Sequence, residues 1–200
     1  ATGTVNLADL AGKTDDLPGP IRTLLSMSTL VVFGIKAAVF PLFFWLPDSY
    51  PTAPAPVTAI FAGLLTKVGV YVILRTQTLL FSDGTTSTLL LVVAGATMVV
   101  GVLGAIAQDD IKRLLSFHIV SQIGYMIMGI GFFTAAGVAA TILFIIHQIA
   151  IKTTLFLIGG LIEDTEGTGS LRRIGGLART RPILAVLFIP VALPVSPRVP

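Results

Sequence analysis

Long apolar segments follow one another along the chain and are separated by short polar turns. A helix that crosses a bilayer needs about 20 predominantly apolar residues. Five segments reach or approach that length: residues 24–46, 57–74, 88–107, 114–133 and 138–162. A sixth apolar run covers residues 182–193, and the later Pro194, Pro197 and Pro200 disfavour a continuing helix. The pattern predicts an all-α, polytopic transmembrane helix bundle with about five complete spans and a partial sixth.

Polar segments divide the chain into four parts. We predict a polar loop at residues 1–20, the transmembrane helix bundle at 21–162, a cytoplasmic loop at 163–181, and the truncated or divergent start of a further helix at 182–200. The first part lacks the basic start and apolar core of a signal peptide, and the sequence begins with Ala1 rather than Met. We therefore expect an internal fragment of a longer membrane protein.

Basic residues in the turns fall on alternate sides of the predicted bundle. One side carries Lys13, Arg22 and Arg75. The other side carries Lys112, Arg113, Arg172, Arg173, Arg179 and Arg181. Because cytoplasmic loops are enriched in Lys and Arg, the second side is predicted to be cytoplasmic, and the first span then runs inward.

The composition agrees with a membrane protein and excludes other classes. Apolar residues make up 54% of the chain and charged residues 12%, whereas soluble domains have about 25% charged residues. The lack of Cys excludes disulfides and thiolate metal sites, and two His are too few for a multi-His metal cage. The net charge of +3 comes without a basic stripe of interleaved aromatics, so we expect no nucleic-acid partner. We likewise expect no cofactor and no bound metal.

Three lysines lie inside apolar runs: Lys36, Lys67 and Lys152, the last of them five residues after His147. A lysine at the centre of a spanning helix makes the free energy of insertion into the bilayer less favourable by roughly 2.5–3.5 kcal/mol. Each Leu or Ile makes it more favourable by only about 0.3–0.6 kcal/mol. Since such residues mark proton and ion paths, we interpret the set as a lysine/histidine proton path. The alternative is that each lysine holds helices together. No Asp or Glu lies inside a predicted span, so the carboxylate partner of Lys36 is expected outside this sequence.

Two further residues belong to this interpretation. Pro41 follows Lys36 by five residues, and a proline inside a helix frees a backbone carbonyl and bends the axis. Lys36 is therefore predicted to lie beside a locally opened backbone, with a simple kink near the helix end as the alternative. His118 shares a helix face with Ser121 and Gln122. These groups either hydrate a path between the lysines or form ordinary interhelical hydrogen bonds.

The sequence around these residues resembles the proton-conducting antiporter-like family. Three blocks carry the resemblance: FGIKAAVFPLFFWLPDSYPTAPAPVTAIFAGLLTKVGVYVILRT, DIKRLLSFHIVSQIGYM and HQIAIKTTLFLIGGLIE. The family contains the large A-type and D-type subunits of Mrp sodium/proton antiporters and the three large antiporter-like membrane subunits of respiratory complex I. The resemblance runs from about Val31 to about Phe188, and the first block is most similar to the D-type branch of the Mrp subunits.

The resemblance implies roles for individual residues. Lys36 matches the lysine of the family's broken seventh helix, which pairs with a glutamate of the fifth helix, and Lys67 matches an eighth-helix lysine that relays protons. His147 and Lys152 match a pair on the eleventh helix. The spans would then be helices seven to eleven of about fourteen. The family's fifth-helix glutamate and twelfth-helix ionisable residue have no counterpart here, and the final VALPVSPRVP departs from the family pattern.

The function implied by the resemblance is that of a fragment of an Mrp-type cation/proton antiporter subunit. It would lie in the lipid bilayer of a bacterial inner membrane, exchange a monovalent cation, expected to be Na⁺, for protons, and work with other subunits of a complex. It would not be an enzyme. The alternative is a proton-pumping, non-redox subunit of NADH:quinone oxidoreductase (complex I) or of a related membrane-bound hydrogenase. A third interpretation is a structural scaffold, which predicts that Lys36→Met and Lys67→Met lower assembly but leave proton flux intact.

Overall fold

The computed structural model describes residues 3, 4, 6–176, 179, 182, 183, 186 and 188. Five helices are long and apolar enough to cross a membrane: α2 (Gly19–Ala37), α4 (Ala55–Leu79), α5 (Ser87–Ile106), α6 (Ile111–Gly131) and α7 (Ala135–Glu166). Three shorter elements accompany them: α1 (Leu7–Lys13), α3 (Trp45–Ser49) and the 3₁₀ turn η1 (Tyr50–Thr52). The predicted all-α bundle with five complete spans is confirmed. The predicted partial sixth span lies almost entirely outside the described residues.

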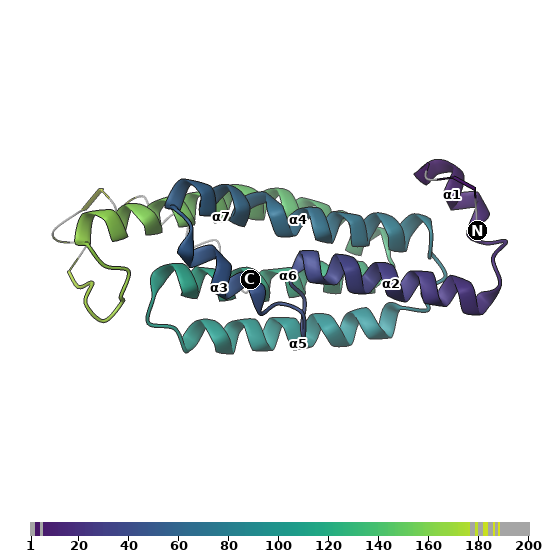
Figure 1. Ribbon diagram of the computed structural model, residues 1–200, viewed down its shortest axis with the longest axis horizontal. Coiled ribbons are helices and arrows are strands. Elements are labelled where there is room, and N and C mark those ends of the chain that lie inside the picture. The colour runs from purple at the N-terminus through teal and green to yellow at the C-terminus, as the bar shows by residue number, and fades with distance from the viewer. Residues whose placement is uncertain are drawn as a thin grey trace.

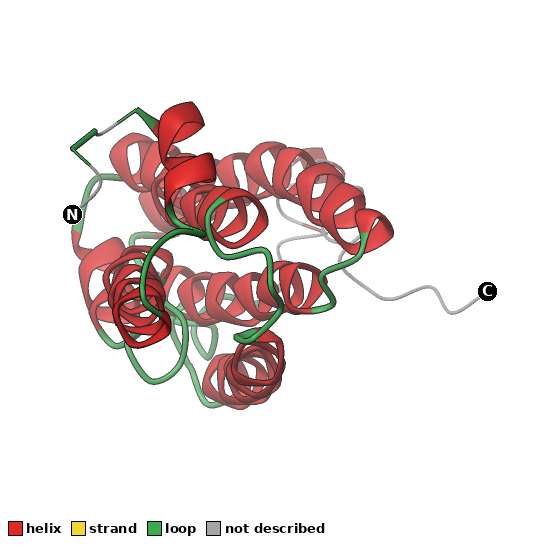
Figure 2. Cartoon of the chain, turned by 90° about the vertical axis from the view of Figure 1, so that its right-hand side faces the viewer, coloured by secondary structure: helices red, strands yellow, loops and turns green. Residues whose placement is uncertain are grey.

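The five long helices lie along the long axis of the molecule, and α1 stands off at the end where α2 begins (Figure 1). Seen from that end, the long helices form one bundle (Figure 2). Helix α6 packs against α3, α4, α5 and α7. It is the most deeply buried of the five spans, followed by α4, whereas α2 is the most exposed. Helix α6 is therefore the centre of the bundle.

Capping residues set the ends of α6 and α7, the two helices that contain the second and third sequence blocks quoted above. Asp110 caps α6, and its side chain accepts a hydrogen bond from the Arg113 N–H at 2.9 Å. Thr134 caps α7 in the same way, accepting from the Gly137 N–H at 3.1 Å. Such side chains satisfy amides that the first helical turn leaves unpaired. Helix α7 ends at Glu166, and the Gly167 that follows has a φ of 69°, the left-handed conformation that terminates helices.

Several helix bounds differ from the predicted spans, and the segment predicted as a polar loop, residues 1–20, contains α1 and the start of α2. Two differences concern helix ends near predicted features. Residues 24–46 do not form one continuous helix, because α2 ends at Ala37 and turns follow up to α3. Ala38 is left-handed, with φ of 62°. The cause is Pro41, which has no N–H for the helical ladder and whose ring clashes with the preceding turn. Helix α7 continues beyond residue 162, into the predicted loop, until Gly167 stops it.

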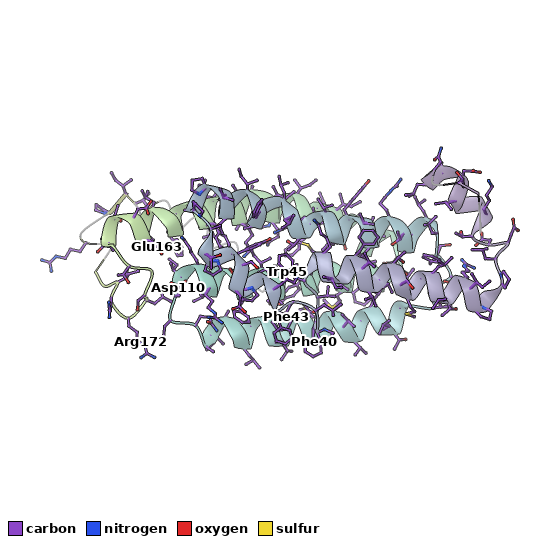
Figure 3. The ribbon with its side chains drawn as sticks, viewed as in Figure 1. Phe40, Phe43, Trp45, Asp110, Glu163 and Arg172 are labelled. Carbon is purple, nitrogen blue, oxygen red and sulfur yellow. The ribbon has the colours of Figure 1, made fainter. Side chains whose placement is uncertain are left out.

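Charged residues gather at the two ends of the bundle, as the loop pattern predicts. At one end the guanidinium of Arg22 lies 3.0 Å from the Asp15 carboxylate and 3.8 Å from that of Asp83. Three ion pairs mark the other end: Lys112–Glu163 at 2.5 Å, Arg113–Asp48 at 3.1 Å and Arg172–Asp109 at 2.9 Å. Figure 3 shows Asp110, Glu163 and Arg172 together at this end. Its assignment to the cytoplasm stays a prediction.

Glu163→Gln is expected to destabilise the bundle by about 1–2 kcal/mol, because it leaves a buried ammonium without its counter-ion. The Lys112 side chain is only 9% exposed, whereas that of Glu163 is 36% exposed. Thermal unfolding of the purified protein in detergent measures the loss. Asp164→Asn is the matched control, since Asp164 is exposed and makes no ion pair among the described residues. Equal melting of the two variants would contradict the expectation.

Candidate functional site

Two lysines are buried in the core of the bundle. Lys67 on α4 is 3% exposed and Lys152 on α7 is fully buried. The Lys67 Nζ donates to the Ala62 carbonyl at 2.5 Å, and the Lys152 Nζ contacts Nδ1 of His118 on α6. Three helices thus bring their basic side chains into one interior region.

Close helix packing places these lysines near each other. Helices α4 and α7 approach at Gly63, where an added Cβ would meet the Thr153 side chain and lie 3.5 Å from the Ile149 carbonyl. Lys67 lies one turn after Gly63, and Lys152 precedes Thr153. Positive charges on both amines would repel each other at this short separation of the helices. Because burying an unpaired charge is expensive, simultaneous protonation of both lysines is costly.

Carboxylates do not neutralise this region within the described part of the chain. The ion pairs there involve Lys13, Arg22, Lys112, Arg113 and Arg172, all of which lie towards the ends of helices or in turns. Lys67 and Lys152 instead contact a carbonyl and an imidazole, which are neutral partners. A buried amine with neutral partners can gain or release a proton more readily than one held in an ion pair.

Amide side chains extend the cluster. The His118 Nε2 lies 3.2 Å from the Gln122 Nε2, and Gln148 on α7 donates through its Nε2 to the Gln122 Oε1 at 3.4 Å. The predicted shared face of His118 and Gln122 is therefore a direct contact. Ser121 points elsewhere, since it packs against Gly101 of α5.

Lys36 occupies a different environment from the two buried lysines. It lies in the last turn of α2 and is exposed on the described chain. Although Lys36 lies inside a long apolar run of the sequence, it is not at the centre of a spanning helix, because α2 ends one residue later. Its backbone nevertheless packs on α4, where a Cβ at Gly69 would lie 3.0 Å from the Lys36 carbonyl carbon. Its place in a proton path stays a prediction.

The predicted break after Lys36 is present, and neighbouring groups satisfy its backbone. The Phe40 N–H donates to the Thr97 Oγ1 of α5 at 3.0 Å. The Trp45 indole N–H donates to the Ile35 carbonyl at 2.9 Å. Irregular backbone at membrane depth is stable only with such partners. The break thus belongs to a packed region and is anchored to a second helix.

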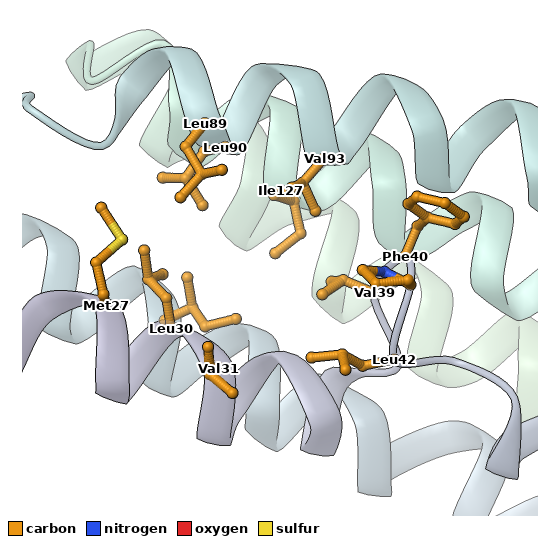
Figure 4. Close-up of a pocket in the computed structure, with 12 residues that line it drawn as sticks. Met27, Leu30, Val31, Val39, Phe40, Leu42, Leu89, Leu90, Val93 and Ile127 are labelled. Atoms are coloured by element: carbon orange, nitrogen blue, oxygen red, sulfur yellow. The ribbon is translucent and has the colours of Figure 1, made fainter.

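An apolar cavity of about 170 Å³ adjoins the break on the side of α5 (Figure 4). Met27, Leu30 and Val31 of α2 line it together with Leu89, Leu90 and Val93 of α5. Pro41 is part of the same lining. Because these walls offer almost no polar atoms, this cavity provides no partner for a proton, and the polar cluster around Lys152 is the better candidate site.

His147 is not brought into the cluster. It is exposed, and its ring stacks on Phe144 with 6.3 Å between ring centroids. A spacing of five residues turns a side chain by roughly 140° around a helix, which separates it from Lys152. Gln148 is four residues before Lys152 and therefore shares its face. Sequence reasoning missed Gln148, although its helical spacing from Lys152 was visible.

Metal ligands do not gather in the described part of the chain, where no three residues of His, Asp or Glu are placed to hold an ion.

Over residues 1–197 the chain matches the family described as NADH:quinone oxidoreductase/Mrp antiporter, transmembrane. It belongs to this family. With five helices able to cross a bilayer, this family member is part of a multi-pass membrane protein.

Individual relatives support the family assignment. The D-type subunit of a Na⁺/H⁺ antiporter from Alkalihalophilus pseudofirmus is 50% identical over 190 residues, covering 94% of this chain and 38% of that protein. A chain in the structure of the Mrp complex from Dietzia sp. DQ12-45-1b matches with a TM-score of 0.89 and 38% identity, covering 96% of this chain and 36% of that chain. A chain of respiratory complex I from Thermus thermophilus has a TM-score of 0.87 and 27% identity, covering 96% and 41%. The chain therefore spans less than half the length of these family members.

Proposed function

We propose that the chain is a segment of an Mrp-type cation/proton antiporter subunit, which exchanges Na⁺ for protons across a bacterial inner membrane. The observation that carries the proposal is the pair of buried lysines Lys67 and Lys152, the second in contact with His118, in a chain half identical to the D-type subunit of a Na⁺/H⁺ antiporter. The protein acts as a transporter subunit and not as a catalytic enzyme. It works together with other subunits, as its structural relatives from multi-subunit membrane complexes suggest.

Protons move in this proposal by successive protonation of buried amines. Lys67 and Lys152 repel each other when both are charged, so a proton arriving at one favours release from the other. His118 contacts Lys152 directly and is the next group on the path. Lys36, beside the broken end of α2, exchanges protons with a carboxylate supplied from outside this segment.

A second candidate is a proton-pumping, non-redox subunit of NADH:quinone oxidoreductase. Its support is the similarity to a chain of respiratory complex I from Thermus thermophilus. The identity of 27% with that chain is lower than the 38% found with a chain of the Mrp complex. The antiporter is therefore the first proposal. The two differ in what drives the proton, a cation gradient or a redox reaction.

Lys67→Met and Lys36→Ala are each expected to lower Na⁺-dependent proton flux by about tenfold or more, because a positioned proton carrier contributes at least that factor. The assay uses inverted vesicles with the full-length protein in its complex, at matched expression. Addition of Na⁺ dissipates a preformed pH gradient, which a dye reports. Unchanged flux in both variants would contradict the lysine path. Proton flux that requires NADH oxidation and does not change with Na⁺ would favour the second candidate.

A further inference from the structure

A ladder of four polar side chains joins α6 to α7 beside the buried lysines. His118 and Gln122 are one turn apart on α6, and Gln148 and Lys152 have the same spacing on α7. The Lys152 Nζ contacts the His118 Nδ1, and the other ring nitrogen lies 3.2 Å from the Gln122 Nε2. Gln148 reaches the Gln122 Oε1 at 3.4 Å. The four groups form one continuous chain of hydrogen bonds that begins at Lys152 and ends at Gln148.

Each link of this chain needs one donor and one acceptor. A charged ammonium only donates, and a neutral imidazole has one nitrogen that donates and one that accepts. A glutamine amide donates through its nitrogen and accepts through its oxygen. These properties leave two consistent directions for the whole chain: charged Lys152 permits only one of them, and the second becomes possible when neutral Lys152 can accept a hydrogen bond.

The first direction belongs to charged Lys152. Its Nζ donates to Nδ1 of His118, so the ring proton lies on Nε2, and Gln122 must present its oxygen to that proton. In the second direction Lys152 is neutral and accepts from a protonated Nδ1, so Nε2 accepts from the Gln122 amide nitrogen. The contacts between the Gln122 Nε2 and the ring, and between the Gln148 Nε2 and Gln122, correspond to this second direction.

No hydrogen bond among the described residues other than that to Gln122 fixes the orientation of the Gln148 amide. Its Oε1 is buried and has no hydrogen-bond partner among the described residues, so rotation of the amide breaks only the bond to Gln122, which forms again after rotation. Gln77 shows the contrast, because its Oε1 accepts from Thr86 at 2.5 Å. The end of the ladder is therefore not tied to a group outside it.

We propose that Gln122 and Gln148 are positioning residues of the proton path, whose amides turn over when Lys152 gains or loses its proton. This inference rests on the proposed function, in which Lys152 carries protons. When Lys152 discharges, its proton passes to Nδ1 of His118, and the proton on Nε2 leaves to a water molecule of the path. The pair loses one proton and one positive charge, and the ring is neutral before and after. The turned Gln122 amide then donates to Nε2 and blocks the return of a proton.

The charges around the ladder are those of the helices packed on it. On α4, Lys67 lies one turn from Gly63, where α4 approaches α7 next to Lys152. Lys112 of α6 and Glu163 of α7 neutralise each other near the charged end of the bundle, and His147 is exposed on another face of α7. Within the described residues, Lys67 is thus the charged group that can bias the ladder.

The test measures the ¹⁵N chemical shifts of the two His118 ring nitrogens by NMR, in the full-length protein in its complex. These shifts report which nitrogen carries the proton. The signal is assigned by its loss in His118→Asn. In the unsubstituted protein the ring proton is expected to move from Nε2 to Nδ1 as rising pH discharges Lys152. Gln122→Glu only accepts while its carboxylate is ionised, so it is expected to keep the proton on Nε2 throughout that pH range. Because the ring proton then cannot leave Nε2, this variant is expected to lower proton flux by about tenfold or more.

Two variants, Gln122→Met and Gln108→Met, distinguish an effect of the hydrogen-bond ladder from the effect of losing any glutamine side chain. Gln122→Met should uncouple the tautomer from pH and lower flux about fivefold to tenfold, the effect of losing one hydrogen bond. The Gln108 side chain, in the turn just after α5, donates to the Gly104 carbonyl of that helix, so its variant should match the unsubstituted protein. A tautomer that stays constant with pH, or Gln122→Glu indistinguishable from the unsubstituted protein in both readouts, overturns the inference. A tautomer that switches while Lys152→Arg retains full flux overturns the proposed function and leaves the switch standing.

Discussion

Lys152→Arg is expected to abolish cation-dependent proton flux while keeping a positive charge at the centre of the bundle. The arginine guanidinium does not release its proton at any accessible pH, so it cannot load and unload. Positioned proton carriers contribute about 10²–10⁴-fold to transfer rates, and we expect a loss of at least about a hundredfold. The contact of Lys152 with His118 makes this the most sensitive position of the cluster. The measurement is Na⁺-driven collapse of a pH gradient in vesicles with the assembled complex.

Lys152→Met distinguishes transport from a structural role. Removing the Lys152 amine also removes the cost of burying it, which offsets a cost of about 1–3 kcal/mol for leaving the His118 Nδ1 without its partner. This variant should therefore assemble about as well as the unsubstituted protein and yet transport no protons. Lys13→Met is the matched control, because Lys13 forms an exposed pair with Asp9 on α1. If Lys152→Met lowers assembly and leaves flux per complex intact, the lysine is a helix-holding residue and the proton path is wrong.

The sequence alone predicts the five spans because an apolar run of sufficient length has few other stable structures. It does not predict where α2 ends. Residues 39–46 are as apolar as a helix interior, and the end depends on groups distant in sequence. The Phe40 N–H finds its acceptor in Thr97, and the Ile35 carbonyl finds its donor in Trp45. Pro41 indicates that a break exists, but its partners emerge only from the packing of α5.

The candidate site is predictable by residue type and only partly by position. Lys67 and Lys152 stand out because ionisable residues are costly in apolar runs. Gln148 does not stand out in the sequence, because burying a neutral amide in an apolar segment costs much less free energy than burying a charge. Its helical spacing nevertheless places it on the face of Lys152. His147 is more conspicuous by type, but the same geometry directs it away from Lys152. The contact of His118 with Lys152 joins two helices, and no pattern within one helix reveals it.

Gly101→Ala is expected to disrupt the contact between α5 and α6 and to prevent assembly of most of the protein. An added Cβ would lie 2.7 Å from the Ser121 Cα and 2.9 Å from its Cβ. Because backbone atoms cannot rotate away, the two helices must separate.

Such overpacking costs about 3 kcal/mol, enough to remove much of the stability of a marginally stable protein. Gly95→Ala is the control on the same helix, since nothing lies within 4 Å of its added Cβ. Thermal unfolding in detergent and the fraction of assembled complex measure both variants. Helix α6 carries His118, so the Gly101→Ala molecules that do assemble should also show reduced flux, because the ring moves away from Lys152. If both glycine variants melt at the same temperature and assemble equally, α5 and α6 do not approach as closely as Gly101 and Ser121 indicate.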